Sequence, residues 1–409
     1  MRCGQTESGL RYAVLRGGSS AGWCALTCGN GTRDEGGFPA GIAHFTEHTL
    51  FKGTRRKSAA AVNSCLERLG GELNAFTTKE EIVLHATVLK EDLRKAASLL
   101  LELATEAVFP DAAVETERGV VIDEIVSAKD SPADDVYDRF EEELFRGHPL
   151  GRSILGTAAA VRKTGPDQLR RFYAGAFRPD RMALTLVADL DEQRMEALVR
   201  TLSERFFPAG TTAAPERILS VPVLAEPFRK TVDKRNHEVN AVLGGFAPGL
   251  YDGEKRIETI LLCNLLGGPA SNSLLNSLLR ERYGWVYGVE CGYTQYADSG
   301  IATISFGCER PNLDRCLAKI DEVLRRCCET ALSEARLKAA KKQLLGQLLI
   351  SAASGEAQVL SMGKSLVVFG AVESQARTRE RIEAVTAEGL LTRAREVFDP
   401  ERLSRLVFL

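Results

Sequence analysis

Two of the five histidines in this 409-residue sequence lie four positions apart, in the segment His44-Phe45-Thr46-Glu47-His48. On a helix, residues i and i+4 share one face with their Cβ atoms about 5–6 Å apart, so both imidazoles can point at one cation. Neutral imidazole nitrogens are common zinc ligands. Glu47 lies on the same face, from which it can reach a metal-bound water as a general base without binding the metal itself.

The alternative explanation is that two histidines and a glutamate share a helix face by chance. Because histidine is this scarce, we expect a chance match in well under about one such chain in a hundred. The order HxxEH is also the inverted form of the metallopeptidase motif HExxH. The motif therefore predicts a metal-dependent hydrolase.

A catalytic zinc site needs a third protein ligand and one open position. The acidic segment 111–130 is predicted to form a helix, in which Glu117 and Glu124 share a partly apolar face. Two carboxylates on such a face are costly to bury unless a cation compensates them. Solvated carboxylates are the alternative, which fits Glu115 and Asp123 better. Periodicity alone does not choose between Glu117 and Glu124.

The segment GTRDEGGFPAGIAHFTEHTLFKGT, residues 31–54, resembles the pitrilysin/insulinase family of zinc peptidases, which includes the mitochondrial processing peptidases. In that family the third ligand is the second of two glutamates seven apart, about 76 positions after the second histidine. The resemblance therefore implies Glu124 as the ligand beside His44 and His48. It implies Glu117 as a carboxylate that supports the ligands from behind.

Two further segments resemble the family. GGELNAFTTKEE, residues 70–81, is similar to a sheet edge that takes up substrate as an added strand, which implies substrate binding at Asn74 and Ala75. LLRERYGWVYGV, residues 278–289, is similar to the segment with an arginine–tyrosine pair. This implies that Arg280 and Tyr287 steady the substrate carbonyl and oxyanion. Without the family resemblance, the second segment is interpreted as the basic end of a helix followed by an aromatic strand, which is a common structural pattern.

Several predicted elements must position these residues. A β-hairpin is expected from strands at 10–15 and 22–28 around a Gly17-Gly18 turn. Helices are expected at 41–51 and 59–69, with Gly70-Gly71 as a left-handed C-cap. The other expected elements are strands at 81–88 and 182–188 and helices at 91–107, 111–129, 133–146 and 166–174.

The second half of the sequence repeats the order of the first. A strand, a polar turn and a helix in residues 81–101 recur about 220 positions later in residues 301–322. The pattern predicts an α+β fold with two homologous domains, each a mostly antiparallel sheet covered by helices. We expect a zinc-binding domain at 1–208, a proline-rich linker at 209–227 and a second domain at 228–409.

The same shift moves His44, Glu47 and His48 onto Asn264, Gly267 and Gly268. The second domain is therefore expected to lack a metal site, and we predict one zinc ion per chain. The departures from the family, such as Thr49 in place of a hydrophobic residue, remove no ligand position.

Composition limits the partners. Fifty-three basic and 55 acidic residues give a net charge of -2, which argues against nucleic acid as a partner. The sequence contains no apolar run long enough for a membrane span and no secretory signal pattern. None of the ten cysteines forms a CxxC pair, which suits a reducing compartment, so we expect a cytoplasmic protein.

The expected function is a zinc-dependent endopeptidase that hydrolyses peptides or unfolded polypeptide segments, with Glu47 as general base. The resemblance implies pairing of two-domain chains around a chamber, so a homodimer is expected, or a heterodimer with a related chain. The alternative is a non-catalytic family member that acts as a scaffold or as one subunit of a heterodimer. A metal hydrolase with non-peptide substrates is weaker, because the strand-adding segment would have no purpose.

Overall fold

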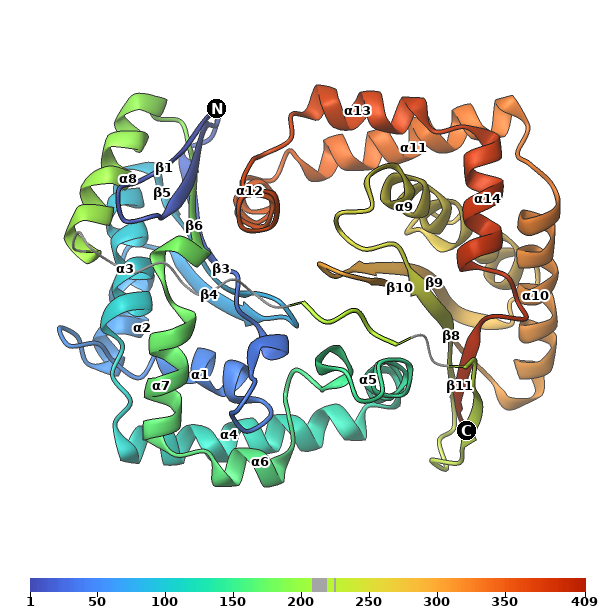
Figure 1. The fold of residues 1–409 in the computed structure, drawn as a ribbon, viewed down its shortest axis with the longest axis horizontal. Helices are drawn as coiled ribbons and strands as arrows, with labels where there is room; N and C mark the ends of the chain where they lie inside the picture. Colours follow the sequence, from blue (N-terminus) through green and yellow to red (C-terminus); the bar gives the residue numbers. More distant parts are fainter. Residues whose placement is uncertain (208–218, 224–225) are drawn as a thin grey trace. The chain divides into compact units, whose positions relative to one another are not determined.

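The computed structural model describes residues 1–207, 219–223 and 226–409. Most of the predicted linker, residues 209–218 and 224–225, lies outside this part, as does residue 208. The chain forms two compact units (Figure 1). Unit 1 comprises residues 1–126, 152–217 and 350–373, and unit 2 comprises residues 127–151, 218–349 and 374–409.

Unit 1 contains a six-stranded sheet in the order β1-β2-β6-β3-β5-β4. β6 pairs with β2 in parallel and with β3 antiparallel, and the remaining pairs are antiparallel. The strands are β1 (Arg2–Gln5), β2 (Arg11–Arg16), β3 (Ala21–Cys28), β4 (Glu72–Thr77), β5 (Ile82–Leu89) and β6 (Met182–Ala188).

The predicted hairpin is wrong in its pairing, although both of its strands exist. β6 lies between β2 and β3, so these two strands are not neighbours. Every residue of β6 is buried, as is typical of a central strand covered on both faces. The glycines at positions 17 and 18 permit a turn, but a local turn does not decide which strand is the partner.

Helices cover both faces of this sheet. In Figure 1, α3 and α8 lie on one side of β3, and α12 lies on the other. The larger core lies on the first side and includes Leu26, Leu84 and Leu186. The helices of unit 1 are α1 (Ile42–Leu50), α2 (Ala59–Glu67), α3 (Leu93–Glu106), α6 (Ala158–Lys163), α7 (Pro166–Ala176), α8 (Glu192–Phe206) and α12 (Gly355–Phe369), together with most of α4 (Asp111–Asp130).

Unit 2 contains a five-stranded sheet in the order β7-β11-β8-β10-β9. Its strands are β7 (Arg229–Val232), β8 (Val239–Ala247), β9 (Val286–Gln295), β10 (Gly300–Cys308) and β11 (Ser404–Phe408). Its helices are α5 (Pro132–Leu144), α9 (Gly253–Gly267), η5 (Asn276–Arg282), α10 (Leu313–Glu329), α11 (Glu334–Ser351), α13 (Gln375–Ala384) and α14 (Ala387–Val397). The last two residues of α11 belong to unit 1.

The pairing patterns of the two sheets confirm two similar α+β folds. β7 is parallel to β11, as β2 is to β6, and β8 lies between β11 and β10, as β3 lies between β6 and β5. The repeated segments are β5 with α3 and β10 with α10, as expected. In this correspondence α9 replaces α1, so the second unit has no HxxEH helix.

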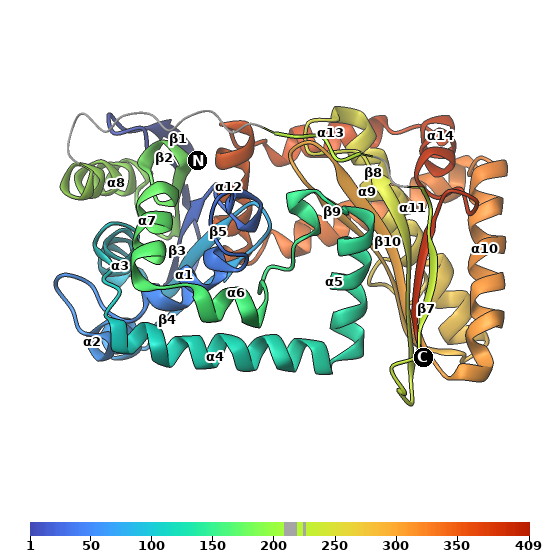
Figure 2. The same cartoon turned by 60° about the horizontal axis from the view of Figure 1, so that its bottom comes forward.

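Two helices cross the boundary that the sequence predicts between the domains. α5, from the first half of the chain, packs on β8 and β11 in unit 2 (Figure 2). α12, from the second half, packs on β3 and β6 in unit 1. The sequence does not reveal this exchange, because an apolar helix stripe fits either of two similar sheets.

No helix within the described ranges has both the length and the apolar composition to cross a bilayer. The cytoplasmic location stays a prediction.

Candidate metal centre

Helix α1 carries the HxxEH motif, and its start is held from outside the helix. Gly41, at its N-terminus, has φ of 88°, and a Cβ there would meet the Leu155 carbonyl oxygen at 2.6 Å. The buried carboxylate of Glu35 accepts hydrogen bonds of 3.0–3.1 Å from the N–H groups of Gly41 and Ala43. These amides would otherwise lack partners, since the first N–H groups of a helix have none within it. The contacts set where the helix begins and which way its histidines point.

His44 and His48 lie side by side on this helix, with ring centroids 4.6 Å apart. Burial first, and then the neighbouring His48, lower the pKa of His44 to about 4. The ring of His44 is therefore neutral at pH 7, which is the form that binds a metal.

Glu124 reaches the two histidines from α4. Its Oε2 lies 3.6 Å from His44 Nε2 and 3.3 Å from His48 Nε2. One ligand atom from each residue lies within 4.8 Å of the other two. The sequence pattern left Glu117 and Glu124 open as ligands. The structure places Glu124 in the cluster, as the family resemblance implied.

The donor set fits a zinc ion. Ligands at about 2.0–2.1 Å from a tetrahedral zinc lie about 3.3 Å from one another. The distances from Glu124 to the two histidines, 3.3 and 3.6 Å, agree with that spacing. Two imidazoles and one carboxylate are also the ligand types of known catalytic zinc sites with an open fourth position. Within the described ranges this is the one group of three convergent candidate ligands.

Glu117 lies behind His48. Its Oε2 is 3.3 Å from His48 Nδ1, and its Oε1 is 2.6 Å from Lys52 Nζ. A carboxylate at Nδ1 orients the ring and leaves Nε2 free to bind a metal. The arrangement agrees with the supporting position expected of Glu117. Sequence reasoning missed Lys52, which lies four positions after His48, just past the end of α1.

Glu47 lies beside the cluster and is not one of its three ligands. Its Oε2 accepts a hydrogen bond of 2.9 Å from Thr77 Oγ1, at the end of β4. Burial raises the pKa of Glu47, and the charge of Glu124 adds to the rise, while Thr77 and His48 lower it. A raised pKa brings a carboxylate closer to the pH at which a general base works best. Thr77 is a second residue that sequence reasoning missed.

Strand β4 carries Asn74 and Ala75 and is the edge of the sheet in unit 1. In the described part of the chain one side of β4 pairs with β5 and the other side has no strand partner. Ala75 packs against the core, and Asn74 points to the opposite face. The hydrogen bond between Thr77 and Glu47 ties this edge to the candidate site. The edge position confirms the expected geometry, and substrate binding there stays a prediction.

Arg280 and Tyr287 lie in unit 2, where both side chains are exposed. They line one cavity of about 560 Å³, together with Tyr137 of α5 and Glu290 of β9. The structure therefore brings the two together, as their expected shared role requires. Their placement opposite the histidine cluster stays a prediction.

Comparisons with known proteins agree with this description. A model of "Insulinase (Peptidase family M16)" matches residues 18–158, and a model of "Peptidase M16 inactive domain" matches residues 164–344. An uncharacterized zinc protease of Mycobacterium leprae is 32% identical over 360 residues, or 88% of this chain and 80% of that protein. The uncharacterized zinc protease YmxG of Bacillus subtilis is 29% identical over 93% of this chain and 91% of that protein.

Solved structures show the same fold. A structure described as the peptidase M16 inactive domain from Pseudomonas fluorescens has a TM-score of 0.90 at 20% identity and covers 100% of this chain and 97% of that chain. A protease from Helicobacter pylori has a TM-score of 0.86 at 19% identity, with coverage of 100% and 98%.

Proposed function

The chain belongs to the insulinase family of peptidases, family M16, and from this premise we propose that it is a zinc-dependent endopeptidase. We propose that His44, His48 and Glu124 hold one zinc ion per chain and that Glu47 is the general base. The observation that carries the proposal is the convergence of these three ligands beside a buried carboxylate that does not join them. The names of the curated relatives, which call them zinc proteases, support the same metal and reaction.

The residues of the chain divide the work of peptide-bond hydrolysis. When bound, zinc supplies a Lewis acid that polarises a carbonyl and makes water more acidic. Glu47 takes the proton of the attacking water on its carboxylate and gives it to the leaving amine. Thr77 Oγ1, 2.9 Å from Glu47 Oε2, holds that carboxylate in place. Glu117 fixes the orientation of His48.

The substrate is proposed to bind as an added strand on β4. Backbone hydrogen bonds along an edge bind peptides with little demand on sequence, which suits peptides or unfolded segments. Thr77 lies at the end of β4 that contacts Glu47, so a strand added to this edge would lead into the site. Arg280 and Tyr287 are proposed to stabilise the negative charge that forms on the carbonyl oxygen.

The experiment that tests the function combines metal analysis with cleavage of a quenched peptide library by the purified chain alone. We expect one zinc per chain and cleavage that a chelator abolishes and added zinc restores. His48→Ala should lose both zinc and cleavage, whereas His237→Ala, an exposed histidine of unit 2, should lose neither.

Zinc binding without cleavage of any library member would contradict the proposal. It would support the non-catalytic alternative, a scaffold or one subunit of a heterodimer.

A further inference from the structure

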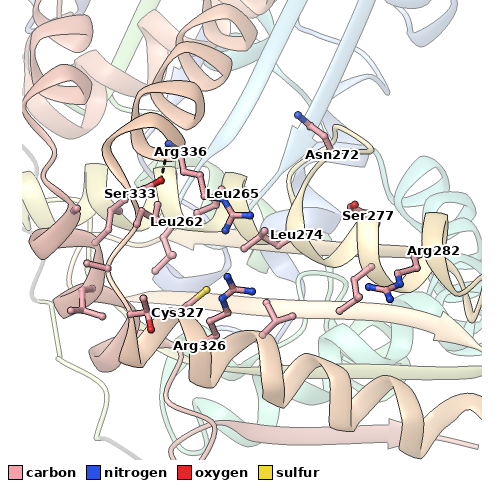
Figure 3. A pocket seen from close by; sticks show the side chains of 18 residues that line it. Leu262, Leu265, Asn272, Leu274, Ser277, Arg282, Arg326, Cys327, Ser333 and Arg336 are labelled. Carbon is pink, nitrogen blue, oxygen red and sulfur yellow. Dashed lines mark hydrogen bonds between the residues drawn. The ribbon is translucent and has the colours of Figure 1, made fainter.

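A cavity of about 670 Å³ lies in unit 2 and opens to solvent, and none of its lining residues takes part in the proposed reaction (Figure 3). Its size is within the range of about 300–1,000 Å³ that is usual for small-molecule sites. Its walls come from α9, η5, α10, the start of α11 and α14, together with the segments between α9 and η5 and between α10 and α11. The apolar lining residues are Leu262, Leu265, Leu274, Leu278, Val323, Cys327, Ala331, Leu332, Ala387, Leu390 and Leu391.

The charged residues that line this cavity all have the same sign. They are Arg282, Arg326 and Arg336, and no aspartate or glutamate lines it. None of the three arginines has an ion-pair partner in the part of the chain that the structure describes. In Figure 3 the side chains of Arg326 and Arg336 reach from different walls toward the same space. All three side chains are exposed, so solvent weakens the repulsion between them, and their shared positive charge favours an anion in the cavity.

The thiol that lines the cavity does not supply that negative charge. Burial raises the pKa of Cys327 to about 11, although Arg326 and Arg336 lower it. The thiol is therefore neutral at pH 7.

The remaining walls indicate what kind of anion fits. Leucines dominate them and no aromatic side chain lines the cavity, so no ring is present on which a nucleotide base could stack. Guanidinium groups recognise carboxylates through paired hydrogen bonds. We propose that this cavity binds an aliphatic carboxylate, a molecule with one anionic head group held by the arginines and a hydrocarbon tail against the leucines.

The cavity shares a helix with the predicted substrate-contact residues. Ser277, Leu278 and Arg282 of η5 line it, whereas Arg280 of the same helix lines the separate cavity that contains Tyr287. η5 is wound as a π-helix, in which the N–H of Tyr283 donates to the carbonyl of Leu278 at 3.2 Å. Such short π-helical turns are frequent at functional sites. A ligand that shifts η5 should therefore shift Arg280, and this regulatory consequence rests on the proposed function.

Binding can be tested directly with laurate, a twelve-carbon carboxylate, by equilibrium dialysis below its micelle concentration. We expect one saturable site per chain, and Arg326→Gln should weaken binding about tenfold or more, as the loss of a charge-assisted contact does. The matched control is Arg325→Gln. It removes the same charge one position away, from a residue that pairs with Glu401 at 2.7 Å and does not line the cavity. Laurate should bind this control as it binds the wild type.

Related compounds separate the two halves of the proposed site. Dodecanol has the same tail without charge, dodecyltrimethylammonium carries the opposite charge, and acetate has the head group without the tail. We expect each to bind at least tenfold more weakly than laurate. Equal binding of laurate and dodecyltrimethylammonium, equal loss in Arg325→Gln and Arg326→Gln, or no saturable binding would overturn the proposal.

The coupling to η5 can be measured without any peptidase activity. Trp285 follows η5 and stacks on Tyr283 with ring centroids 4.2 Å apart, and the guanidinium of Arg282 lies 5.3 Å from the Tyr283 ring. In a Trp23→Phe background, which leaves Trp285 as the single tryptophan, laurate should change the fluorescence and Arg326→Gln should remove that change at the same ligand concentration.

Laurate should also change kcat/KM for peptide cleavage. If fluorescence responds and no peptide is cleaved under any condition, the proposed function fails and the binding site stands. If laurate binds with no change in fluorescence or kcat/KM, the coupling through η5 is wrong.

Discussion

Glu47, Glu117 and Glu124 are three carboxylates of the candidate site, and each has different partners. The Oε2 atom of Glu124 lies near the Nε2 atoms of both histidines. Glu117 contacts Nδ1 of His48 and also Nζ of Lys52, and Glu47 accepts a hydrogen bond from Thr77. Only the first of these arrangements leaves a carboxylate oxygen where the histidine Nε2 atoms converge. All three residues are glutamates, and their different partners are the basis of the different roles that we propose for them.

Replacing one carboxylate oxygen by an amide group distinguishes the proposed general base from the proposed metal ligand. In Glu47→Gln we expect zinc to stay bound, because Glu47 is not among the three ligands, and kcat/KM to fall about 10²–10⁴-fold, as is usual when a general base is lost. Glu124→Gln should lose zinc as well as activity. Metal analysis and peptide cleavage of the same preparations measure both effects. Near-normal turnover in Glu47→Gln would remove Glu47 from the role.

Glu35 predicts a pH dependence of stability. Burial raises its pKa to about 7, while the hydrogen bonds from Ala43 and Gly41 lower it. Because the folded-state pKa lies above the unfolded value of 4.5, the folded state holds the proton more tightly. The associated stability is complete below pH 4.5 and is lost as the pH rises through about 7.

Relative to Glu35→Gln, which does not titrate, the wild type should lose unfolding free energy on the order of 3 kcal/mol between pH 4.5 and 8. Denaturant unfolding of both proteins across this range measures the difference. A difference that is constant with pH, or that grows in favour of the wild type, would show that Glu35 is ionised throughout.

At the scale of elements, the site depends on an edge strand next to a helix whose start is held in place. α1 has only nine residues, and Ile42, Phe45 and Leu50 are buried in the core of unit 1. Its packing and its contacts with Glu35 stabilise it, since an isolated helix of this length is marginal in water. β4 ends beside it, which brings backbone groups for substrate and the carboxylate for proton transfer together.

The edge strand predicts an alternating response to substrate methylation. If a peptide adds to β4 as a strand, every second amide N–H points at β4 and the others point away. N-methylation at successive positions of a cleaved peptide should therefore raise KM about three- to tenfold at alternate positions and little between them. Michaelis–Menten kinetics on such a peptide series measures this. A uniform effect along the peptide would argue against strand addition.

At the scale of the whole molecule, the five strands of unit 2 repeat the order of five of the six strands of unit 1, and in the described residues the group of candidate metal ligands lies in unit 1. Duplication followed by loss of the ligands in one copy accounts for both facts. The second unit retains a cavity with Arg280 and Tyr287. This gives it a role in substrate contact under the proposed function.

A homodimer with sites shared between subunits predicts complementation. Arg280→Ala and His48→Ala are each expected to be inactive. If each site combines the metal centre of one subunit with Arg280 of the other, an equal mixture should recover about a quarter of wild-type activity, because half of the dimers are mixed and each has one intact site.

A mixture of Arg280→Ala with Tyr287→Phe is the matched control for that experiment. Both changes lie in unit 2, so every site of the mixed dimer has one defect, and no recovery is expected. Absence of recovery in the first mixture, with subunit exchange verified, would place the complete site within one chain.

Local pattern was enough to predict the HxxEH helix, the strands β2, β3, β5 and β6, most helices of the first half of the chain and the duplicated α+β fold. These features follow from residue spacing over one or a few turns, where side-chain periodicity reports directly on backbone geometry. The edge position of β4 was implied by the family resemblance. Family resemblance added Glu124, which periodicity alone could not distinguish from Glu117.

Contacts between residues far apart in the chain had to come from the folded structure. The insertion of β6 between β2 and β3 and the exchange of α5 and α12 depend on which apolar surfaces meet, and many pairings satisfy the same pattern. The partners Lys52, Thr77 and Glu35 depend on where side chains arrive once the sheet and helices have packed. The type of a polar residue determines which hydrogen bonds it can donate or accept. Its neighbours in the folded structure determine which of these interactions form.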